Sequence, residues 1–96
     1  MKDLLKDLNK AFENKVRLGI MSALMVNEYV DFNTLKDLLG ASDGNLASHL
    51  KSLEKSEYIT FEKEFIDRKP NTKYMATKAG KSAFVKHVKA IEQLIK

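Results

Sequence analysis

Apolar side chains recur three or four residues apart in five stretches of the chain, which is the spacing of amphipathic helices. The apolar positions are Leu4, Leu5, Leu8 and Phe12; Val16, Ile20, Ala23 and Leu24; Leu35, Leu38 and Leu39; Leu46, Leu50 and Leu53; and Phe84, Val88, Ile91 and Ile95. The spacing predicts a first helix over 3–12 and a last helix over 77–95. Leu18, Met21 and Met25 widen the second stripe, so its helix is expected to be more deeply buried than the first.

Residues that start and stop helices frame these stretches. The candidate N-caps are Asn14 for the second helix, Asn33 or Thr34 for the third, Ser42 or Asp43 for the fourth, and Thr77 for the last. Gly40 is suited to end the third helix in the left-handed conformation. Two short helices joined by a tight turn that contains glycine predict a helix-turn-helix over about residues 33–56.

The apolar period changes from 3.6 to 2 after Tyr58, which indicates a strand. The alternating apolar residues are Ile59, Phe61 and Phe65. Residues 67–71 are rich in turn formers, and Pro70 and Asn71 suit the second and third turn positions. Residues 72–76 then pair back, which gives a hairpin over about 59–76. An earlier segment, 29–32, is long enough only for a brief edge strand.

The order of these elements predicts a mainly α-helical chain with a small β-hairpin, in the α+β class. With 96 residues, the chain is expected to form a single domain over 1–96, because two separate cores would each be too small. No apolar run approaches the roughly 20 residues that span a bilayer, and the start of the chain has no uninterrupted signal core. We therefore expect a cytoplasmic protein without a membrane partner.

Catalytic and metal-binding classes find little support in the sequence. The chain has no cysteine, and its two histidines, His49 and His87, lie on different predicted helices, so no ligand set converges. We find no nucleophile motif, glycine-rich phosphate loop or carboxylate pair. The sequence therefore predicts a protein that is not an enzyme and that needs no cofactor or metal.

The net charge of +4 admits a polyanionic partner without requiring one, but its distribution is informative. Residues 1–20 carry five basic and three acidic groups, 21–57 three and six, 58–78 five and three, and 79–96 four and one. The middle of the chain is therefore acidic and both flanks are basic. A nucleic-acid partner would depend on the basic residues of the hairpin more than on the overall charge.

Four local sequences resemble those of the small prokaryotic winged helix-turn-helix transcriptional regulators of the MarR-like and ArsR-like group. They are Arg17-Leu18-Gly19-Ile20, Phe32 to Gly40, Asp43 to Leu53, and Thr77-Lys78-Ala79-Gly80. The resemblance covers roughly residues 12–90. It departs at Glu57, where the family usually has glycine after the recognition helix, and at Ala76, where leucine usually precedes the threonine.

The resemblance implies a winged helix-turn-helix fold with extra terminal helices, and sequence-specific binding of double-stranded DNA. The recognition helix would enter the major groove, and the hairpin, or wing, would reach the minor groove or phosphates. With its leucines inward, this helix turns its polar residues outward. The candidate DNA contacts are Thr34, Ser42, Gly44, Asn45, Ser48, His49, Lys51, Ser52, Arg68, Lys69 and Lys73. The alternatives are a solvated polar face and, for Thr34, a capping role.

The two terminal helices carry more apolar surface than a domain of this size readily covers. We expect a homodimer with an interface formed by Leu4, Leu5, Leu8, Phe12, Phe84, Val88, Ile91 and Ile95. The competing interpretations are an intramolecular core and a helix on a membrane surface. Such a dimer could also enclose a pocket for a small-molecule effector, whose identity the sequence does not specify.

A second functional class stays open at this stage. Three acidic residues, Asp43, Glu54 and Glu57, lie on or beside the recognition helix. A winged-helix module that binds a protein and not DNA would also account for them.

Overall fold

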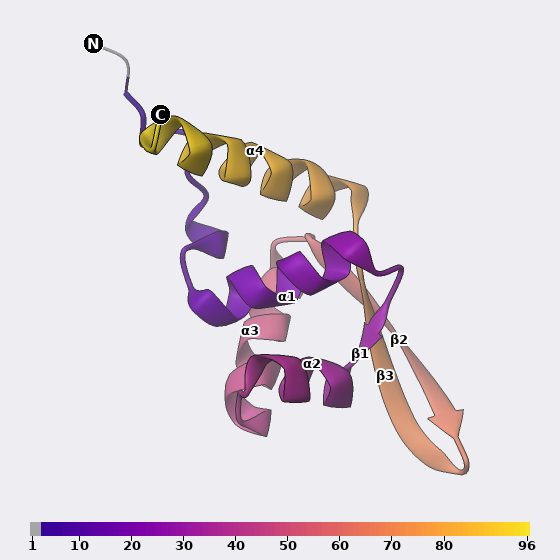
Figure 1. Ribbon diagram of the computed structural model, residues 1–96. Helices are drawn as coiled ribbons and strands as arrows, with labels where there is room; N and C mark the ends of the chain where they lie inside the picture. Colours follow the sequence, from indigo (N-terminus) through magenta and orange to yellow (C-terminus); the bar gives the residue numbers. More distant parts are fainter. Residues whose placement is uncertain (1–2) are drawn as a thin grey trace.

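Residues 3–96, which the computed structural model describes, form four α-helices, one short 3₁₀ helix and a three-stranded antiparallel sheet (Figure 1). The elements are η1 (Lys10–Phe12), α1 (Lys15–Val26), β1 (Val30–Asp31), α2 (Phe32–Leu39), α3 (Asp43–Lys55), β2 (Ile59–Ile66), β3 (Lys69–Ala76) and α4 (Lys78–Leu94). The fold is therefore the predicted α+β arrangement, with the helix-turn-helix in α2 and α3 and the hairpin in β2 and β3.

The helices α1, α2 and α3 pack around one core, which the base of the sheet and the first half of α4 complete. The side chains that are almost fully buried are Phe12, Ile20, Met21, Leu24, Leu35, Leu46, Leu50 and Leu53. All of them except Met21 belong to the apolar stripes that define the helices in the sequence, and Met21 lies beside one of these stripes. The expectation that the second helix is deeply buried is confirmed, since α1 contributes four buried residues.

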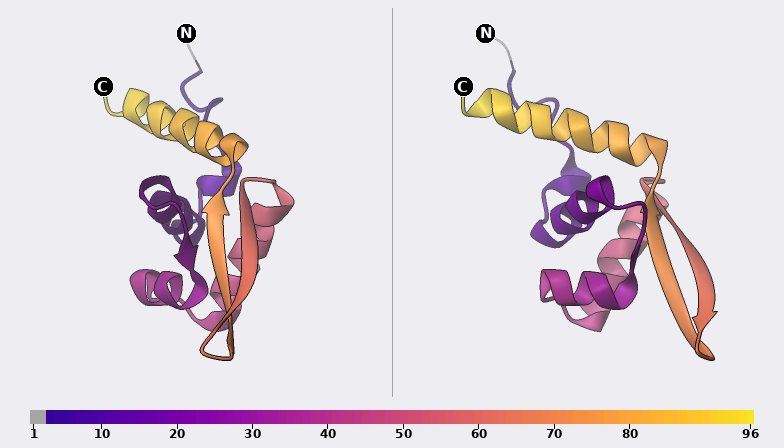
Figure 2. Two further views of the ribbon diagram at one scale, coloured as in Figure 1. Left: turned by 90° about the vertical axis from the view of Figure 1, so that its right-hand side faces the viewer. Right: turned by 45° about the vertical axis from the view of Figure 1, so that its right-hand side comes forward.

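The sheet has the strand order β1-β3-β2, so β3 is central only where β1 reaches it. Val30 of β1 pairs with Tyr74 of β3, while β2 pairs with β3 from Ile59 opposite Ala76 to Ile66 opposite Lys69. The outer half of the hairpin is consequently two-stranded and projects from the body of the molecule (Figures 1 and 2). It forms the wing.

Side-chain caps set most of the helix starts. The predicted caps Asn14, Ser42 and Thr77 each accept backbone N–H groups at the start of α1, α3 and α4. The prediction for α2 is wrong, because Asp31 and neither Asn33 nor Thr34 is the cap: its carboxylate accepts the N–H of Thr34 at 2.8 Å. Gly40 ends α2 in the left-handed conformation as predicted, with φ of 61°.

The end of α3 is closed by a left-handed residue that is not glycine. Glu57 has φ of 62°; its N–H donates to the carbonyl of Glu54, and the N–H of Tyr58 donates to the carbonyl of Leu53. These two bonds are those of a Schellman motif, which satisfies the last carbonyls of a helix. The departure at Glu57 therefore leaves the helix end intact, but at a conformational cost.

Replacing Glu57 by glycine is expected to stabilise the protein by about 1 kcal/mol, because glycine adopts positive φ without a steric penalty. The measurement is the free energy of unfolding in urea. Glu57→Ala removes the same charge but keeps the penalty, so this control should stay close to the parent protein. Equal stability of the two variants would contradict the explanation.

The predicted N-terminal helix over 3–12 is wrong. Its only helical part is the single turn η1, and Asn9 has extended backbone angles, with φ of −105° and ψ of 119°. The N–H of Asn9 donates to Nδ1 of His87 at 2.9 Å, and its carboxamide donates to the hydroxyl of Tyr58 at 3.0 Å. An isolated helix of ten residues is marginal in water, so these tertiary bonds outweigh its helical period.

The hairpin turn also differs from the prediction. The turn residues are Asp67 and Arg68, both with positive φ, and Pro70 lies within β3 opposite Phe65. A two-residue turn with two positive φ angles matches the twist of a hairpin, whereas the predicted turn centred on Pro70 does not. Phe61 and Phe65 are exposed as well, so only Ile59 of the alternating apolar set is buried.

Candidate nucleic-acid interface

The outer face of α3 is polar and open to solvent over its whole length. All of the predicted contacts on this helix and its cap are exposed except His49, which is half-buried. Ser48, Lys51, Ser52 and Lys55 line a shallow depression of about 260 Å³ on that face. Because Leu46, Leu50 and Leu53 fix the opposite face in the core, the orientation of this polar face is determined by packing.

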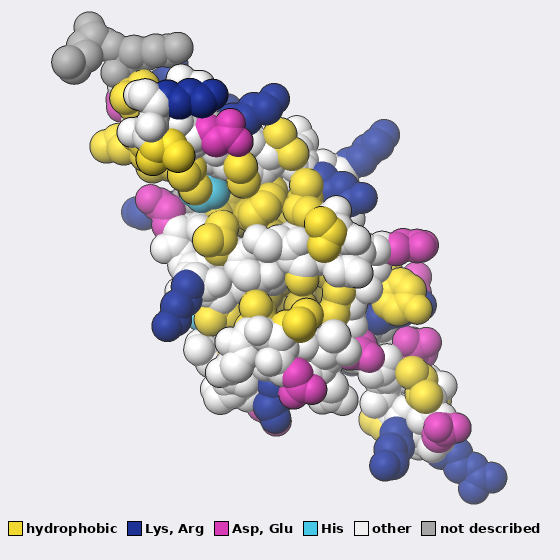
Figure 3. All heavy atoms as spheres, viewed as in Figure 1, with side chains coloured by type: hydrophobic (Ala, Val, Ile, Leu, Met, Phe, Trp, Pro, Cys, Tyr) yellow, Lys and Arg dark blue, Asp and Glu magenta, His cyan; other side chains and the backbone are white. Residues whose placement is uncertain are grey.

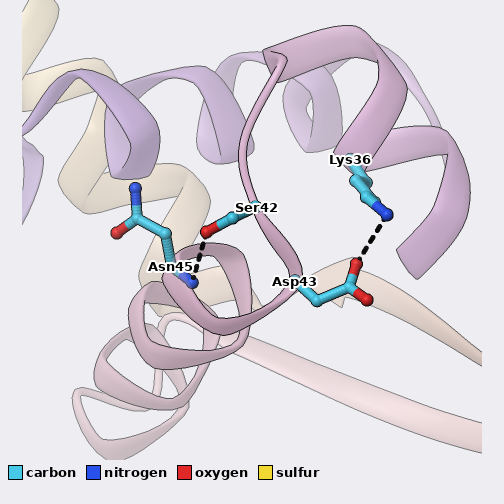
Figure 4. A network of polar contacts seen from close by, with 4 residues as sticks. All are labelled: Lys36, Ser42, Asp43 and Asn45. Atoms are coloured by element: carbon cyan, nitrogen blue, oxygen red, sulfur yellow. Dashed lines mark hydrogen bonds and ion pairs between the residues drawn. The ribbon is translucent and has the colours of Figure 1, made fainter.

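The start of α3 is held by a small polar network (Figure 4). The hydroxyl of Ser42 accepts the backbone N–H of Asn45 at 3.2 Å, and Nζ of Lys36 lies 2.8 Å from the carboxylate of Asp43. The hydrogen bond and charge of Asp43 raise the pKa of Lys36. The side chain of Asn45 points away from this ion pair (Figure 4). The ion pair joins the two helices and offsets the negative charge of Asp43.

His49 occupies the flank of α3 that faces α1. Its Nδ1 lies 3.0 Å from a guanidinium nitrogen of Arg17, whose Nε in turn donates to the carbonyl of Ala11. Burial and the neighbouring guanidinium lower the pKa of His49. Arg17 is thus a residue of this site that the sequence analysis did not assign.

Thr34 lies in the first turn of α2. Its backbone N–H is already bound by Asp31, so this amide is not free to hold a phosphate, and the carboxylate beside it would repel one. Its side chain is exposed and does not cap the helix. The capping alternative for Thr34 is therefore wrong, and its hydroxyl stays a candidate for a direct contact.

The tip of the wing carries two exposed basic residues, Arg68 and Lys69, and Figure 3 shows basic side chains at the end of the hairpin. Lys73 is not among them. It lies near the base of the wing, 3.6 Å from the carboxylate of Glu62 and with Nζ 4.5 Å from the ring centroid of Tyr29. These contacts hold Lys73 against the sheet, so we remove it from the set of candidate DNA contacts.

The second histidine, His87, is buried beneath the N-terminal segment. Besides the bond from Asn9, its ring packs against Phe12 with centroids 5.5 Å apart. Burial lowers the pKa of His87, and the carboxylate of Glu13 opposes this shift only in part. In the described part of the chain, no three His, Asp or Glu side chains form a group that could hold a metal ion.

Lowering the pH below about 6.5 is expected to destabilise the protein. The pKa of His87 is lower in the folded chain than in the unfolded chain. In this pH range the unfolded chain therefore binds a proton at His87 more readily than the folded chain does. The contribution is fully present above the unfolded-state pKa and is lost as the pH falls toward the folded-state pKa; His49 adds in the same direction. Urea unfolding at several pH values measures this dependence. His87→Gln, which cannot titrate, should show a weaker decline than the parent.

Exposed apolar side chains lie on α4 and on the N-terminal segment. We call this set the terminal surface; it comprises Leu4, Leu5, Val85, Val88, Ile91, Leu94 and Ile95. Yellow side chains gather at this end of the molecule in Figure 3. Phe12 and Phe84 do not belong to it, since they pack edge to face in the protomer's own core, which corrects their assignment to a dimer interface. Leu8 is half-buried.

None of the helices within residues 3–96 combines the length and the apolar character that crossing a bilayer requires.

An apolar cavity of about 390 Å³ opens between the start of the chain and the second half of α4. Its apolar lining consists of Leu8, Phe12, Leu18, Ile91 and Leu94.

A helix-turn-helix followed by a projecting hairpin defines a winged helix-turn-helix protein. The family model described as winged helix DNA-binding domain matches residues 16–95, and the chain belongs to this family. The uncharacterized protein MJ0432 of Methanocaldococcus jannaschii is 38% identical over 87 residues, which cover 91% of this chain and 95% of that protein.

Solved structures share the fold. A transcriptional regulator homologue from Pyrococcus horikoshii superposes with a TM-score of 0.85 at 28% identity, and the match covers 96% of this chain and 89% of the other. NadR in complex with 4-hydroxyphenylacetate matches with a TM-score of 0.75 at 20% identity, over 96% of this chain and 64% of NadR. The winged-helix interpretation of the sequence is confirmed.

Proposed function

We propose that this protein is a homodimeric transcriptional regulator that binds specific sequences of double-stranded DNA. The observation that carries the proposal is the exposed polar face of α3 beside a basic wing tip, in a chain of a DNA-binding family. Such a regulator acts in the cytoplasm of a prokaryotic cell, where the chromosome lies, and needs no catalytic group.

Helix α3 enters the major groove in this proposal. A groove about 12 Å wide admits one helix, and base edges are read by side chains opposite the packed face. Asn45 can hold an adenine through two hydrogen bonds, Ser48 and Ser52 suit either donors or acceptors, and Lys51 suits guanine or a phosphate. Gly44 has no side chain, and no protein atom lies within 4 Å of the position that a Cβ would take. The phosphate backbone can therefore approach this residue closely.

The wing places Arg68 and Lys69 against the adjacent minor groove or its phosphates. Arg68 occupies the left-handed region, with φ of 66°, at a turn position that hairpins usually give to glycine. A guanidinium kept there at a conformational cost supports a role for the side chain, because strained positions persist where function requires them.

Two copies of the protein would pair through the terminal surface, which lies at the end of the molecule opposite the wing tip (Figures 1 and 2). A two-fold dimer places its recognition helices one helical turn of DNA apart, about 34 Å, so its target would be a pseudo-palindrome. The apolar cavity behind the terminal surface is the place where a small effector would touch both α4 and the N-terminal segment.

The test is a binding titration with duplex DNA from upstream of the protein's own gene, at several salt concentrations. We expect affinity to fall with salt and to exceed that for random duplex. A salt slope near zero, or equal affinity for random duplex, would contradict the proposal. Co-purification with a protein partner, without duplex binding at low salt, would instead favour the interaction module.

The variant Arg68→Gly tests the role of the wing, because the stability of the protein and its affinity for DNA should change in opposite directions. Glycine relieves the positive φ and should stabilise the hairpin by about 1 kcal/mol, while loss of one phosphate contact should reduce the salt slope by about 1. Asp67→Gly is the matched control at the other turn residue, since it relieves φ of 50° without removing positive charge. Arg68→Gly binding DNA as tightly as Asp67→Gly would remove the wing from the interface.

A further inference from the structure

The imidazole of His49 is held in a single tautomer by Arg17. A guanidinium nitrogen of Arg17 lies 3.0 Å from Nδ1 of His49. A guanidinium stays protonated and has hydrogen-bond donors but no acceptor, so Nδ1 must be the acceptor and must carry no hydrogen. The hydrogen of the neutral ring therefore lies on Nε2, which becomes a donor only.

The free donor of His49 reaches the protein surface. Among residues 3–96, every buried side-chain nitrogen or oxygen has a hydrogen-bond partner, whereas Nε2 of His49 has none, so Nε2 is accessible to solvent. On α3, His49 lies one turn from both Asn45 and Ser52, on the same side of the helix. His49 thus lies on the flank beside the face that is proposed to meet DNA.

Arg17 is itself held in place at a second point. Its Nε donates to the backbone carbonyl of Ala11, so the guanidinium spans from the segment before α1 to the recognition helix. The planar guanidinium of Arg can make both hydrogen bonds at once in a fixed geometry. A Lys ammonium on its flexible stem holds such a geometry less rigidly. The charge of Arg17 also opposes protonation of His49, which would turn Nδ1 into a second donor.

We propose that Arg17 is a positioning residue that makes His49 a fixed hydrogen-bond donor, and that Nε2–H of His49 binds an acceptor on a base edge in the major groove. This inference rests on the proposed function. The acceptors offered there are N7 of purines, O6 of guanine and O4 of thymine, whereas the exocyclic amino groups of adenine and cytosine are donors and would be rejected. His49 would therefore discriminate between bases at one position of the target.

The first experiment needs no DNA. The ¹⁵N chemical shifts of an imidazole report which ring nitrogen carries the hydrogen. We expect the Nε2–H form alone in the parent protein near neutral pH, and a mixture of both tautomers in Arg17→Leu. A hydrogen on Nδ1 in the parent, or unchanged tautomers in Arg17→Leu, would overturn the inference whatever the protein binds.

The second experiment measures base discrimination. A duplex selected by the parent protein is varied one base pair at a time, and we expect one position where replacing the acceptor weakens parent binding about fivefold to tenfold. His49→Ala and Arg17→Leu should both lose this preference at the same position. A preference that survives in both variants would refute the inference, and absence of any specific duplex would refute the proposed function instead.

Two controls separate positioning from folding and from phosphate contact. Arg17→Lys keeps a charged donor for Nδ1 and should restore at least part of the base preference, even if its urea midpoint is lower than that of the parent. Methylphosphonate substitution in the duplex removes phosphate charge. If a methylphosphonate weakens binding of the parent but not of His49→Ala, His49 contacts that phosphate, and the base-reading role is overturned.

Discussion

Gly80→Ala should destabilise the protein by about 3 kcal/mol. A Cβ atom at this position would lie 2.0 Å from the carbonyl oxygen of Tyr58 and 2.8 Å from its carbon, well inside van der Waals contact. The carbonyl cannot move aside easily, because it accepts the N–H of Thr77 at 3.0 Å while the N–H of Tyr58 is bound to Leu53. The added methyl group would therefore separate the start of α4 from the end of α3.

Urea denaturation of Gly80→Ala measures this effect, and Gly44→Ala is its control. Nothing lies within 4 Å of a Cβ at Gly44, which is also helical, so alanine there should leave stability unchanged or raise it by up to about 1 kcal/mol. Gly19→Ala should fall between the two, because its Cβ would meet only the flexible end of Leu39. Equal stability of the Gly80 and Gly44 variants would refute the proposed close approach.

The double variant Val88→Glu, Ile95→Glu is expected to be monomeric and to bind its DNA at least about 100-fold more weakly than the parent. Both residues belong to the terminal surface, and two carboxylates there would have to be desolvated when copies associate. A monomer can engage only one half-site, so the avidity of the dimer is lost. Light scattering gives the mass, and a titration with the selected duplex gives the affinity.

Val26→Glu is the matched control for the dimer. Val26 and Ile95 are each 81% exposed, but Val26 lies at the end of α1 and outside the terminal surface. This variant should keep the mass and the affinity of the parent. If the double variant keeps the parent's mass, the terminal surface does not pair two copies; if it is monomeric but binds DNA unchanged, the protein binds as a monomer.

Local signals predicted most of the fold because the tertiary structure agrees with them. The stripe of Leu46, Leu50 and Leu53 is buried as its spacing requires, and Thr77 caps α4 as its position suggests. The prediction of a first helix was wrong because tertiary contacts outweigh the local pattern in this segment. There the bonds of Asn9 to His87 and Tyr58 cross 78 and 49 residues of sequence, and no local pattern contains them.

The wing shows a second limit of local prediction. Pro70 is a strong turn former, but a proline is also tolerated in a strand where its missing N–H has no partner strand to bond. Pro70 lies in such a part of β3, where β1 does not reach. Alternation of Phe61 and Phe65 with polar residues indicates a strand correctly but says nothing about burial, since the outer wing has no core to pack against.

One part of the candidate site could be predicted from the sequence and another part could not. The polar face of α3 follows from its period alone, because the leucines fix which side faces outward. The pairs Arg17 with His49 and Lys36 with Asp43 depend on how helices pack, and nothing in the spacing of these residues indicates a contact. They add polar contacts between the recognition helix and its neighbours α1 and α2.

The hydroxyl of Thr77 belongs to two helices at once. It accepts the N–H of Gly80 at the start of α4 and donates to the carbonyl of Glu57 just after α3. The end of the helix that would read DNA and the start of the helix that would join two copies are therefore linked through one side chain. If two copies pair through α4 as proposed, a tilt of α4 would act on α3 through this side chain, and the spacing of the two recognition helices would depend on how the copies pair.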